Sequence, residues 1–290
     1  MIINERLVKY IDERKLIHEN QIGFKKHSRT TDHIFVLNTI INKYIAKGKK
    51  LYTCFVDLKK AFDTVNRYKL MYKLKQTGVG TLLYNIIKNM YLSSKAMLHV
   101  KIGGSLSNSF ESEIGVYQGD VLSPILFNLY IDGITKEFDE SCEPAQIDDK
   151  QISSLLYADD IVLVSTSESG LQIAVDKLSS YCSKWNLKVN IDKTKVMFFN
   201  RGAKLIETKI QLNGFKLQNS ETYKYLGILF SCKGKLSQAK TDLSNRGQKA
   251  IFKVRSMFKN GSVPYNTIMH LFDHIIKPIL LYGSEIWGLT

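Results

Sequence analysis

The sequence of 290 residues lacks the features that mark membrane, secreted or linker-rich proteins. It contains no run of about 18 apolar residues, and its amino terminus has no basic region followed by an apolar block, so we expect neither a membrane-spanning helix nor a secretion signal. Four prolines are too few for a proline-rich linker, and no internal repeat occurs. The four cysteines have no paired spacing, which argues against a zinc site or a small disulfide framework and predicts reduced thiols in an intracellular protein.

Basic residues exceed acidic ones by 41 to 27, which gives a formal net charge of +14. Such an excess favours a polyanionic partner, and nucleic acid is the first candidate. A solvated lysine-rich surface would give the same total. The basic residues are spread along the chain, with local clusters at 47–50 and 184–195 and no basic tail, so a binding surface would have to be built by folding.

The hydrophobic pattern predicts both helices and strands. Helical periodicity covers residues 1–17, 31–46, 67–76 and 80–91, and an apolar run at 51–58 is typical of a buried strand. Residues 95–102 and 108–114 flank Gly103-Gly104, which indicates a hairpin. Ser123 followed by Pro124 predicts a helix that the serine hydroxyl caps and that runs to about Phe138.

The second half of the chain begins with a predicted polar loop at 139–150. Strands are then expected at 155–157 and 161–164, a helix at 168–186, and strands at 196–199, 209–217 and 223–230, the second bent at Asn213-Gly214. Only helical patterns follow residue 236. The predicted fold class is α+β, with a helical appendage that starts near residue 235.

Three acidic side chains stand at unusual places in this pattern. Asp57 ends an apolar strand, and Asp159 and Asp160 occupy a turn between two strands. A half-buried carboxylate is costly unless it is paired, hydrogen-bonded or bound to a metal. If these strands are neighbours in one sheet, the acids converge and two Mg²⁺ ions would neutralise them, as in phosphoryl transfer. The alternative is that Asp159 and Asp160 are ordinary turn residues.

Four segments occur in a fixed order around these acids. They read Phe-Val-Asp-Leu-Lys-Lys-Ala-Phe-Asp at 55–63, Gly-Val-Tyr-Gln-Gly-Asp-Val-Leu-Ser-Pro-Ile-Leu-Phe-Asn at 115–128, Tyr-Ala-Asp-Asp at 157–160 and Tyr-Lys-Tyr-Leu-Gly at 223–227. Together they resemble the palm of a reverse transcriptase. Gln-Ile-Gly-Phe-Lys at 21–25 extends the resemblance to the reverse transcriptases of non-LTR (LINE-type) retrotransposons, over roughly residues 4–230.

The resemblance implies an architecture and an assignment of parts. It implies a right-hand polymerase palm, an antiparallel sheet with helices behind it, and partial fingers. Residues 1–230 would form the partial fingers and the palm, and residues 231–290 a helical thumb-like segment whose basic residues suit phosphate contacts.

The same resemblance implies roles for individual residues. Asp57, Asp159 and Asp160 would be the catalytic, metal-binding acids, and Lys193 would protonate the pyrophosphate leaving group or screen phosphates. Phe62, Gln118 and Gly119 would bind the incoming nucleotide, and the Phe62 ring would exclude a 2′-OH. Tyr225, Leu226 and Gly227 would hold the primer terminus. The alternatives are a core aromatic at Phe62, a solvated basic loop at Lys193 and plain sheet packing at 225–227.

The implied activity is RNA-directed DNA polymerisation in the cell, with the nucleus as the expected compartment. The implied partners are an RNA template, a DNA primer and deoxynucleoside triphosphates, with two Mg²⁺ ions, or Mn²⁺ as a substitute, and no membrane; the resemblance implies no oligomeric state. An Arg-Pro-Ile segment usual in the family is absent, and no proline precedes Pro124, so we expect an N-terminally truncated domain. The alternative function is a catalytically silent retroelement fragment that only binds nucleic acid. An RNA-dependent RNA polymerase would share the acids, but Phe62 disfavours it.

Overall fold

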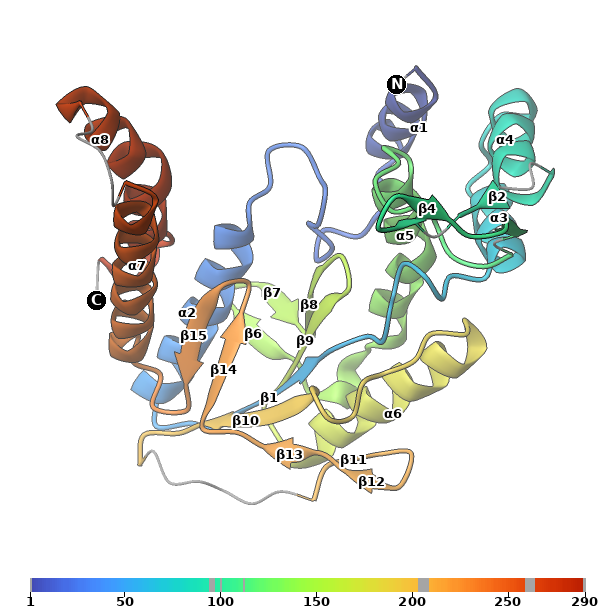
Figure 1. The fold of residues 1–290 in the computed structure, drawn as a ribbon. Helices are drawn as coiled ribbons and strands as arrows, with labels where there is room; N and C mark the ends of the chain where they lie inside the picture. The colour runs from blue at the N-terminus through green and yellow to red at the C-terminus, as the bar shows by residue number, and fades with distance from the viewer. Residues whose placement is uncertain are drawn as a thin grey trace. The chain divides into compact units, whose positions relative to one another are not determined.

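A computed structural model describes residues 2–93, 97–99, 101–111, 113–202, 209–258 and 264–288 (Figure 1). The chain divides into two compact units. The first contains Met1–Arg29, Tyr52–Val196 and Thr208–Gln218, and the second contains Thr30–Leu51, Met197–Glu207 and Asn219–Thr290. The predicted division at residue 230 follows family resemblance and stays a prediction.

The first unit is built on an antiparallel sheet in which β1 (Leu51–Val56) pairs with β9 (Asp160–Ser165), and β9 pairs with β8 (Ser154–Tyr157). The strands β10 (Lys195–Phe199) and β13 (Gln218–Asn219) begin in this unit and complete the order β13-β10-β1-β9-β8. Val162, Leu163 and Val164 are fully buried, as expected for β-branched and aliphatic residues in a central strand. The predicted strands at 51–58, 155–157, 161–164 and 196–199 are confirmed.

Side-chain caps begin two helices of this unit. Ser167 caps α6 (Glu168–Lys184) by accepting a hydrogen bond from the Gly170 N–H at 2.9 Å, and Asn66 caps α3 (Arg67–Gln76) in the same way through Lys69 N at 3.0 Å. The helix α6 packs against β9, and α3 packs against α5 (Ser123–Ile131). The helical elements of the unit are α1 (Ile2–Glu13), α3 (Arg67–Gln76), α4 (Thr81–Lys88), η1 (Asn89–Ser93), α5 (Ser123–Ile131), η2 (Asp132–Glu137), η3 (Glu140–Cys142) and α6 (Glu168–Lys184).

The helix that begins at Ser123 corrects one prediction. Ser123 does not cap it, because the capping position belongs to Leu122, which offers no side-chain hydrogen bond. The Ser123 hydroxyl instead donates to the Tyr117 carbonyl at 2.5 Å, while the Asp120 carboxylate accepts from Leu122 N at 3.2 Å. The α-helix ends at Ile131 and continues as the 3₁₀ helix η2 to Glu137, close to the predicted end at Phe138.

The first unit also contains short β-hairpins. A hairpin around Gly103-Gly104 is confirmed by the pairs β3 (Lys101–Ile102) with β4 (Ser105–Leu106) and β2 (Met97–Leu98) with β5 (Phe110–Glu111); residues 95, 96, 100 and 112 of the predicted strands lie outside the described residues. The predicted strand at 209–217 is a hairpin of β11 (Gln211–Leu212) and β12 (Phe215–Lys216) around Asn213-Gly214.

The expectation of a plain polar loop at 139–150 is wrong. This stretch contains η3 and the hairpin of β6 (Ala145–Ile147) with β7 (Lys150–Ile152). Cys142 and Ala145 are fully buried and tie the stretch to the core. The prediction failed because the stretch is mostly polar, and its two buried apolar residues form no recognisable pattern.

The second unit combines a helix, a hairpin and a helical end. It contains α2 (Thr30–Ala46), β14 (Thr222–Tyr225), β15 (Ile228–Ser231), α7 (Ser237–Met257), α8 (Tyr265–Leu271), η4 (Phe272–Ile276), α9 (Lys277–Leu280) and α10 (Ser284–Trp287). The helix α7 packs against β15 and α9, and α10 packs against α2. Within the described part of the chain only helices follow residue 236, as predicted. The single strand predicted at 223–230 is two paired strands joined at Leu226-Gly227.

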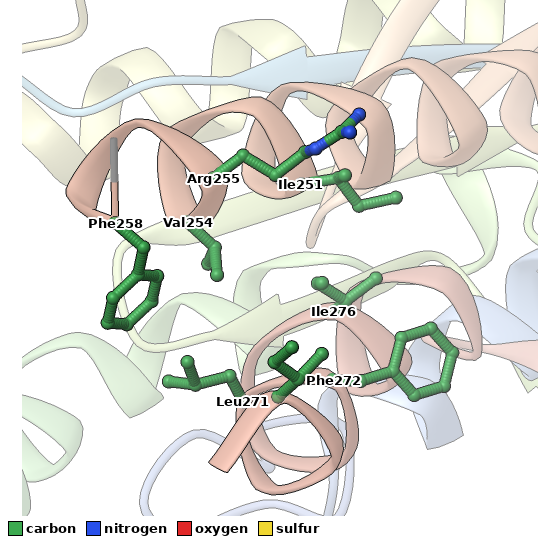
Figure 2. A pocket seen from close by; sticks show the side chains of 8 residues that line it. Ile251, Val254, Arg255, Phe258, Leu271, Phe272 and Ile276 are labelled. Atoms are coloured by element: carbon green, nitrogen blue, oxygen red, sulfur yellow. The ribbon is translucent and has the colours of Figure 1, made fainter. Parts of the chain in front are cut away.

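The helical end of the second unit contains a partly open, mainly apolar pocket of about 530 Å³. Figure 2 shows Val254 and Phe258 on one side of it and Leu271 and Ile276 on the other. It is lined from the C-terminal half of α7 and from α8 and η4.

The fold class α+β is confirmed. None of the helices in the described ranges is long and apolar enough to cross a membrane. All four cysteines are buried free thiols.

Candidate active site

The sheet brings the segments of the three predicted acids together. Val56 at the end of β1 pairs with Ile161 of β9, so Asp57, which follows Val56, and Asp160, which precedes Ile161, lie at the same end of this antiparallel pairing. Asp159 lies in the turn between Tyr157 and Asp160, which face each other in the β8–β9 pairing. Asp57 and Asp159 are partly buried, whereas Asp160 is exposed over the residue as a whole.

Mutual repulsion marks these carboxyl groups as neighbours. Burial raises the pKa of Asp159, and the charge of Asp57 raises it further. Burial, followed by the charges of Asp159 and Asp57, raises the pKa of Asp160 to about 6. A cation bound beside Asp159 and Asp160 would relieve the repulsion that contributes to these two raised pKa values.

A buried glutamine holds the turn that carries Asp159 and Asp160. Ala158 has a φ of +55°, a conformation unfavourable for a residue with a Cβ. The Gln21 side chain, fully buried, accepts from Ala158 N at 3.0 Å and donates to the Ala158 carbonyl at 3.3 Å. Its oxygen also accepts from Gly23 N at 3.0 Å. Both backbone groups of the strained residue are therefore satisfied by one amide.

Gly23 lies directly against this turn. A Cβ at residue 23 would stand 2.3 Å from Ala158 N and 3.0 Å from the carbonyl carbon of Tyr157. Only glycine allows this approach of two backbones. The segment 21–25 of the sequence motif thus supports the acidic turn, a role that its residue types did not reveal.

Lys193 lies beside Asp57 in a pocket of about 450 Å³. Lys59, Lys60 and Lys188 line the same pocket. A pocket lined by four exposed lysines and one aspartate has an excess of positive charge, which suits a phosphate chain. The sequence analysis assigned a role to Lys193 alone, although Lys59 and Lys60 lie within the motif at 55–63 and Lys188 lies in the basic cluster at 184–195.

Phe62 stands on a packed aromatic base. Its ring stacks on the fully buried Phe127 ring with centroids 4.5 Å apart and an angle of 17° between planes. The exposed Phe24 ring lies nearly perpendicular to the Phe62 ring, with the two ring centroids 6.4 Å apart. Phe62 is only partly buried, so the ring is fixed below and accessible above.

Gln118 and Gly119 are exposed in the loop before α5. The Gln118 amide donates to the Asp63 carboxylate at 2.7 Å, one residue after Phe62. Gly119 has a φ of +89° and nothing within 4 Å of a Cβ built on it, so the backbone there is open to a ligand.

Arg67 supports the start of this loop from within the unit. It is buried, and its guanidinium donates to the carbonyls of Gly115 at 2.9 Å and Ile114 at 3.3 Å. It also lies 4.9 Å from the Tyr117 ring centroid. Nothing in the spacing of Arg67 pointed to this role.

Tyr225, Leu226 and Gly227 lie in the second unit, at the turn of the β14–β15 hairpin. Tyr225 is buried, and Leu226 and Gly227 have φ values of +44° and +86°. The Tyr282 hydroxyl donates to the Leu226 carbonyl at 2.7 Å, and Arg246 donates to the Gly227 carbonyl at 2.9 Å. The turn is therefore fixed within its own unit.

The donor chemistry of the three acids fits magnesium. Among the residues that the structure describes, no group of three His, Cys, Asp or Glu side chains forms a ready-made metal site. Magnesium, however, is usually held by one or two carboxylates that water and substrate phosphates complete, and the repulsion seen at Asp159 and Asp160 is what a cation relieves.

Comparison with known families gives one match over most of the chain. Residues 1–230 match the family described as "Reverse transcriptase (RNA-dependent DNA polymerase)". Among curated proteins, the "RNA-directed DNA polymerase from mobile element jockey" of Drosophila melanogaster is 26% identical over 100% of this chain and 31% of that protein. The "Retrovirus-related Pol polyprotein from type-2 retrotransposable element R2DM" of the same fly is 27% identical over 74% of this chain and 21% of its own length. The chain thus spans about a third or less of these relatives.

Solved structures show the same fold at low identity. Telomerase from Candida tropicalis, in complex with a fragment of telomeric RNA, has a TM-score of 0.57 and 16% identity, over 98% of this chain and 46% of that one. The apo enzyme truncated from its C-terminal domain gives the same TM-score over 79% of this chain and 43% of that one.

Proposed function

Because this chain belongs to the reverse transcriptase (RNA-dependent DNA polymerase) family, we propose that it is the polymerase core of a non-LTR retrotransposon protein. It would extend a DNA primer with deoxynucleotides on an RNA template. The observation that carries the proposal is the β1–β9 register, which sets Asp57 against the Asp159-Asp160 turn.

The acids would hold the divalent ions of the reaction. Asp57, Asp159 and Asp160 supply only oxygen donors, which suit Mg²⁺ or Mn²⁺. Two divalent metal ions bound there would lower the pKa of the primer 3′-OH and stabilise the leaving oxygens. The chain's own contribution is a rigid sheet edge that keeps three repelling carboxylates in place before the ions arrive.

The neighbouring residues would receive the nucleotide. The partly exposed Phe62 ring would lie under the sugar, and Gln118 and Gly119 would face the nucleotide from the loop before α5. Lys193, with Lys59, Lys60 and Lys188, would contact the triphosphate and give a proton to the departing pyrophosphate.

The second unit would hold the primer. Hydrogen bonds from Tyr282 and Arg246 fix the Leu226-Gly227 turn, whose backbone would face the primer terminus, with Tyr225 packed below. Basic residues of α7, among them Lys249 and Lys253, would contact duplex phosphates.

Primer extension on an RNA template tests this proposal. The purified chain is expected to incorporate deoxynucleotides only with Mg²⁺ or Mn²⁺, and Asp159→Ala is expected to remove this incorporation. Binding of primer–template without any synthesis above the Asp159→Ala level would instead identify a silent nucleic-acid-binding fragment.

A further inference from the structure

Residues of the segment 188–194 form three hydrogen bonds with Asp57. Asn190 N donates to the Asp57 carbonyl at 2.7 Å, and the Asp57 N–H donates to the Thr194 hydroxyl at 3.3 Å. The third contact is made by a side chain: Asn190 Nδ2 donates to Asp57 Oδ2 at 2.9 Å. The N–H, the C=O and one carboxylate oxygen of Asp57 are thus all bound to one short stretch of chain.

Further backbone contacts fix the segment 188–194 in place. Thr194 N donates to the Asn190 carbonyl at 2.9 Å, and Thr194 is fully buried. Next to it, Lys59 N donates to the Lys188 carbonyl at 2.7 Å, and Leu58 and Val189 form an antiparallel bridge. The backbone of Asn190 therefore cannot shift without breaking hydrogen bonds within and between the two segments.

We propose that Asn190 is a positioning residue for Asp57: its amide holds Oδ2 and so aims Oδ1 at the ion site. Among the hydrogen bonds of the described residues none reaches Oδ1, which leaves that oxygen for a ligand. A carboxylate that is free to rotate pays an entropic cost whenever it binds an ion, and hydrogen bonds from neighbours to ligating groups remove this cost. The proposal rests on the proposed function, in which Asp57 is an ion ligand.

Two substitutions separate positioning from packing. Asn190→Asp has the same shape but presents oxygen instead of an N–H donor to Asp57, and Asn190→Ala removes the group. If positioning matters, both variants lose about 10- to 100-fold in kcat at saturating Mg²⁺, while KM for the deoxynucleotide and affinity for primer–template stay within about threefold. If Asn190 only fills space, Asn190→Asp retains wild-type kcat, and the proposal is overturned.

Asn213→Asp is the matched control, because Asn213 is exposed in the β11–β12 turn and bonds to Ser179 instead of to an acid. Melting temperatures of all variants exclude unfolding as the cause of a loss.

A binding measurement distinguishes failure of this inference from failure of the proposed function. Mn²⁺ binding to the intact chain is followed by electron paramagnetic resonance in wild type, Asn190→Ala and Asp57→Ala. Weaker binding in both variants supports the inference, even for a chain that synthesises nothing. Weaker binding in Asp57→Ala but wild-type binding in Asn190→Ala refutes the positioning role. Wild-type binding in Asp57→Ala refutes the ion site itself, and the inference fails with it.

Discussion

At the scale of single residues, Phe62 offers the sharpest test of sugar selection. The Phe62 ring is held in place by stacking on the Phe127 ring. Replacing Phe62 with a smaller side chain therefore opens space above Phe127. We expect Phe62→Val to lower the preference for deoxynucleotides over ribonucleotides, measured as a ratio of kcat/KM values, by about tenfold or more. Phe215→Val, at an exposed phenylalanine, is the control. Unchanged discrimination would show that Phe62 is a core aromatic and not a gate.

Lys73 offers a test of stability against pH. Its ammonium lies 4.0 Å from the Trp185 ring centroid and donates to Tyr181 and to the Tyr130 carbonyl. Burial lowers the pKa of Lys73 to about 7. The charged groups that face it are Asp132, Lys136, Glu137 and Lys184; the first and third raise this pKa and the two lysines lower it.

Because the folded pKa of Lys73 is below the unfolded value, the unfolded chain binds the extra proton between about pH 7 and pH 10. The free energy of unfolding of wild type should therefore rise relative to Lys73→Met across this window, on the order of 1–3 kcal/mol. Urea unfolding at pH 6.5, 8 and 9.5, chosen as roughly spanning the window, measures this difference. Lys75→Met, on an exposed position of the same helix, should show no such trend. A constant difference between wild type and Lys73→Met would contradict the expectation.

Residue types alone identified the groups with unusual chemistry but not those that hold them. Asp57 attracted attention because a carboxylate ended an apolar strand, and the turn at Asp159 because two acids followed a tyrosine between strands. Gln21 and Asn190 are single polar residues whose sequence neighbours do not reveal a partner. Their roles depend on contacts with Ala158 and Asp57, more than 130 positions away, which no local pattern encodes.

At the scale of elements, the contact between residue 23 and the β8–β9 turn carries a prediction. A Cβ added by Gly23→Ala would meet the backbone of Ala158 and Tyr157, which cannot swing away as a side chain could. We expect about 1–3 kcal/mol of destabilisation from overpacking and a loss of kcat of at least about tenfold, since the acids move with the turn.

Gly80→Ala is the matched control for this change, because a Cβ at residue 80 meets nothing within 4 Å and its φ is −55°. Melting temperature and primer extension are measured for both variants. A Gly23→Ala protein with wild-type kcat would show that the turn is held by its own strands alone.

Element types were more predictable than their ends and joints. Amphipathic periodicity located α3 and α6, and the structure adds that Asn66 and Ser167 cap their starts. The pattern failed at Ser123, whose hydroxyl found a carbonyl instead of an amide, and at 223–230, where the turn at Leu226-Gly227 lies inside a continuous apolar stretch. Leucine is rarely found at positive φ, so glycine was the only residue in this sequence stretch that indicated a turn.

At the scale of the whole molecule, the net charge of +14 makes a prediction about binding without catalysis. Asp57→Asn removes one negative charge and leaves the basic surface intact. It should therefore abolish synthesis and retain primer–template affinity, with log affinity falling by about 0.9 per neutralised duplex phosphate for each unit of log salt. Fluorescence anisotropy at several salt concentrations measures the slope. Equal slopes for wild type and variant are expected, and retained synthesis would refute the metal role of Asp57.

The pairing of β1 with β9 also has a consequence for biosynthesis. It joins Val56 to Ile161, 105 positions later, so this contact closes a very long loop and forms late relative to local helices. A nascent polypeptide still lacking β9 can display Asp57 but cannot assemble the cluster, and every message truncated before that strand yields an inert product. Premature termination before β9 would therefore abolish the proposed polymerase activity completely instead of reducing it in proportion to the missing length.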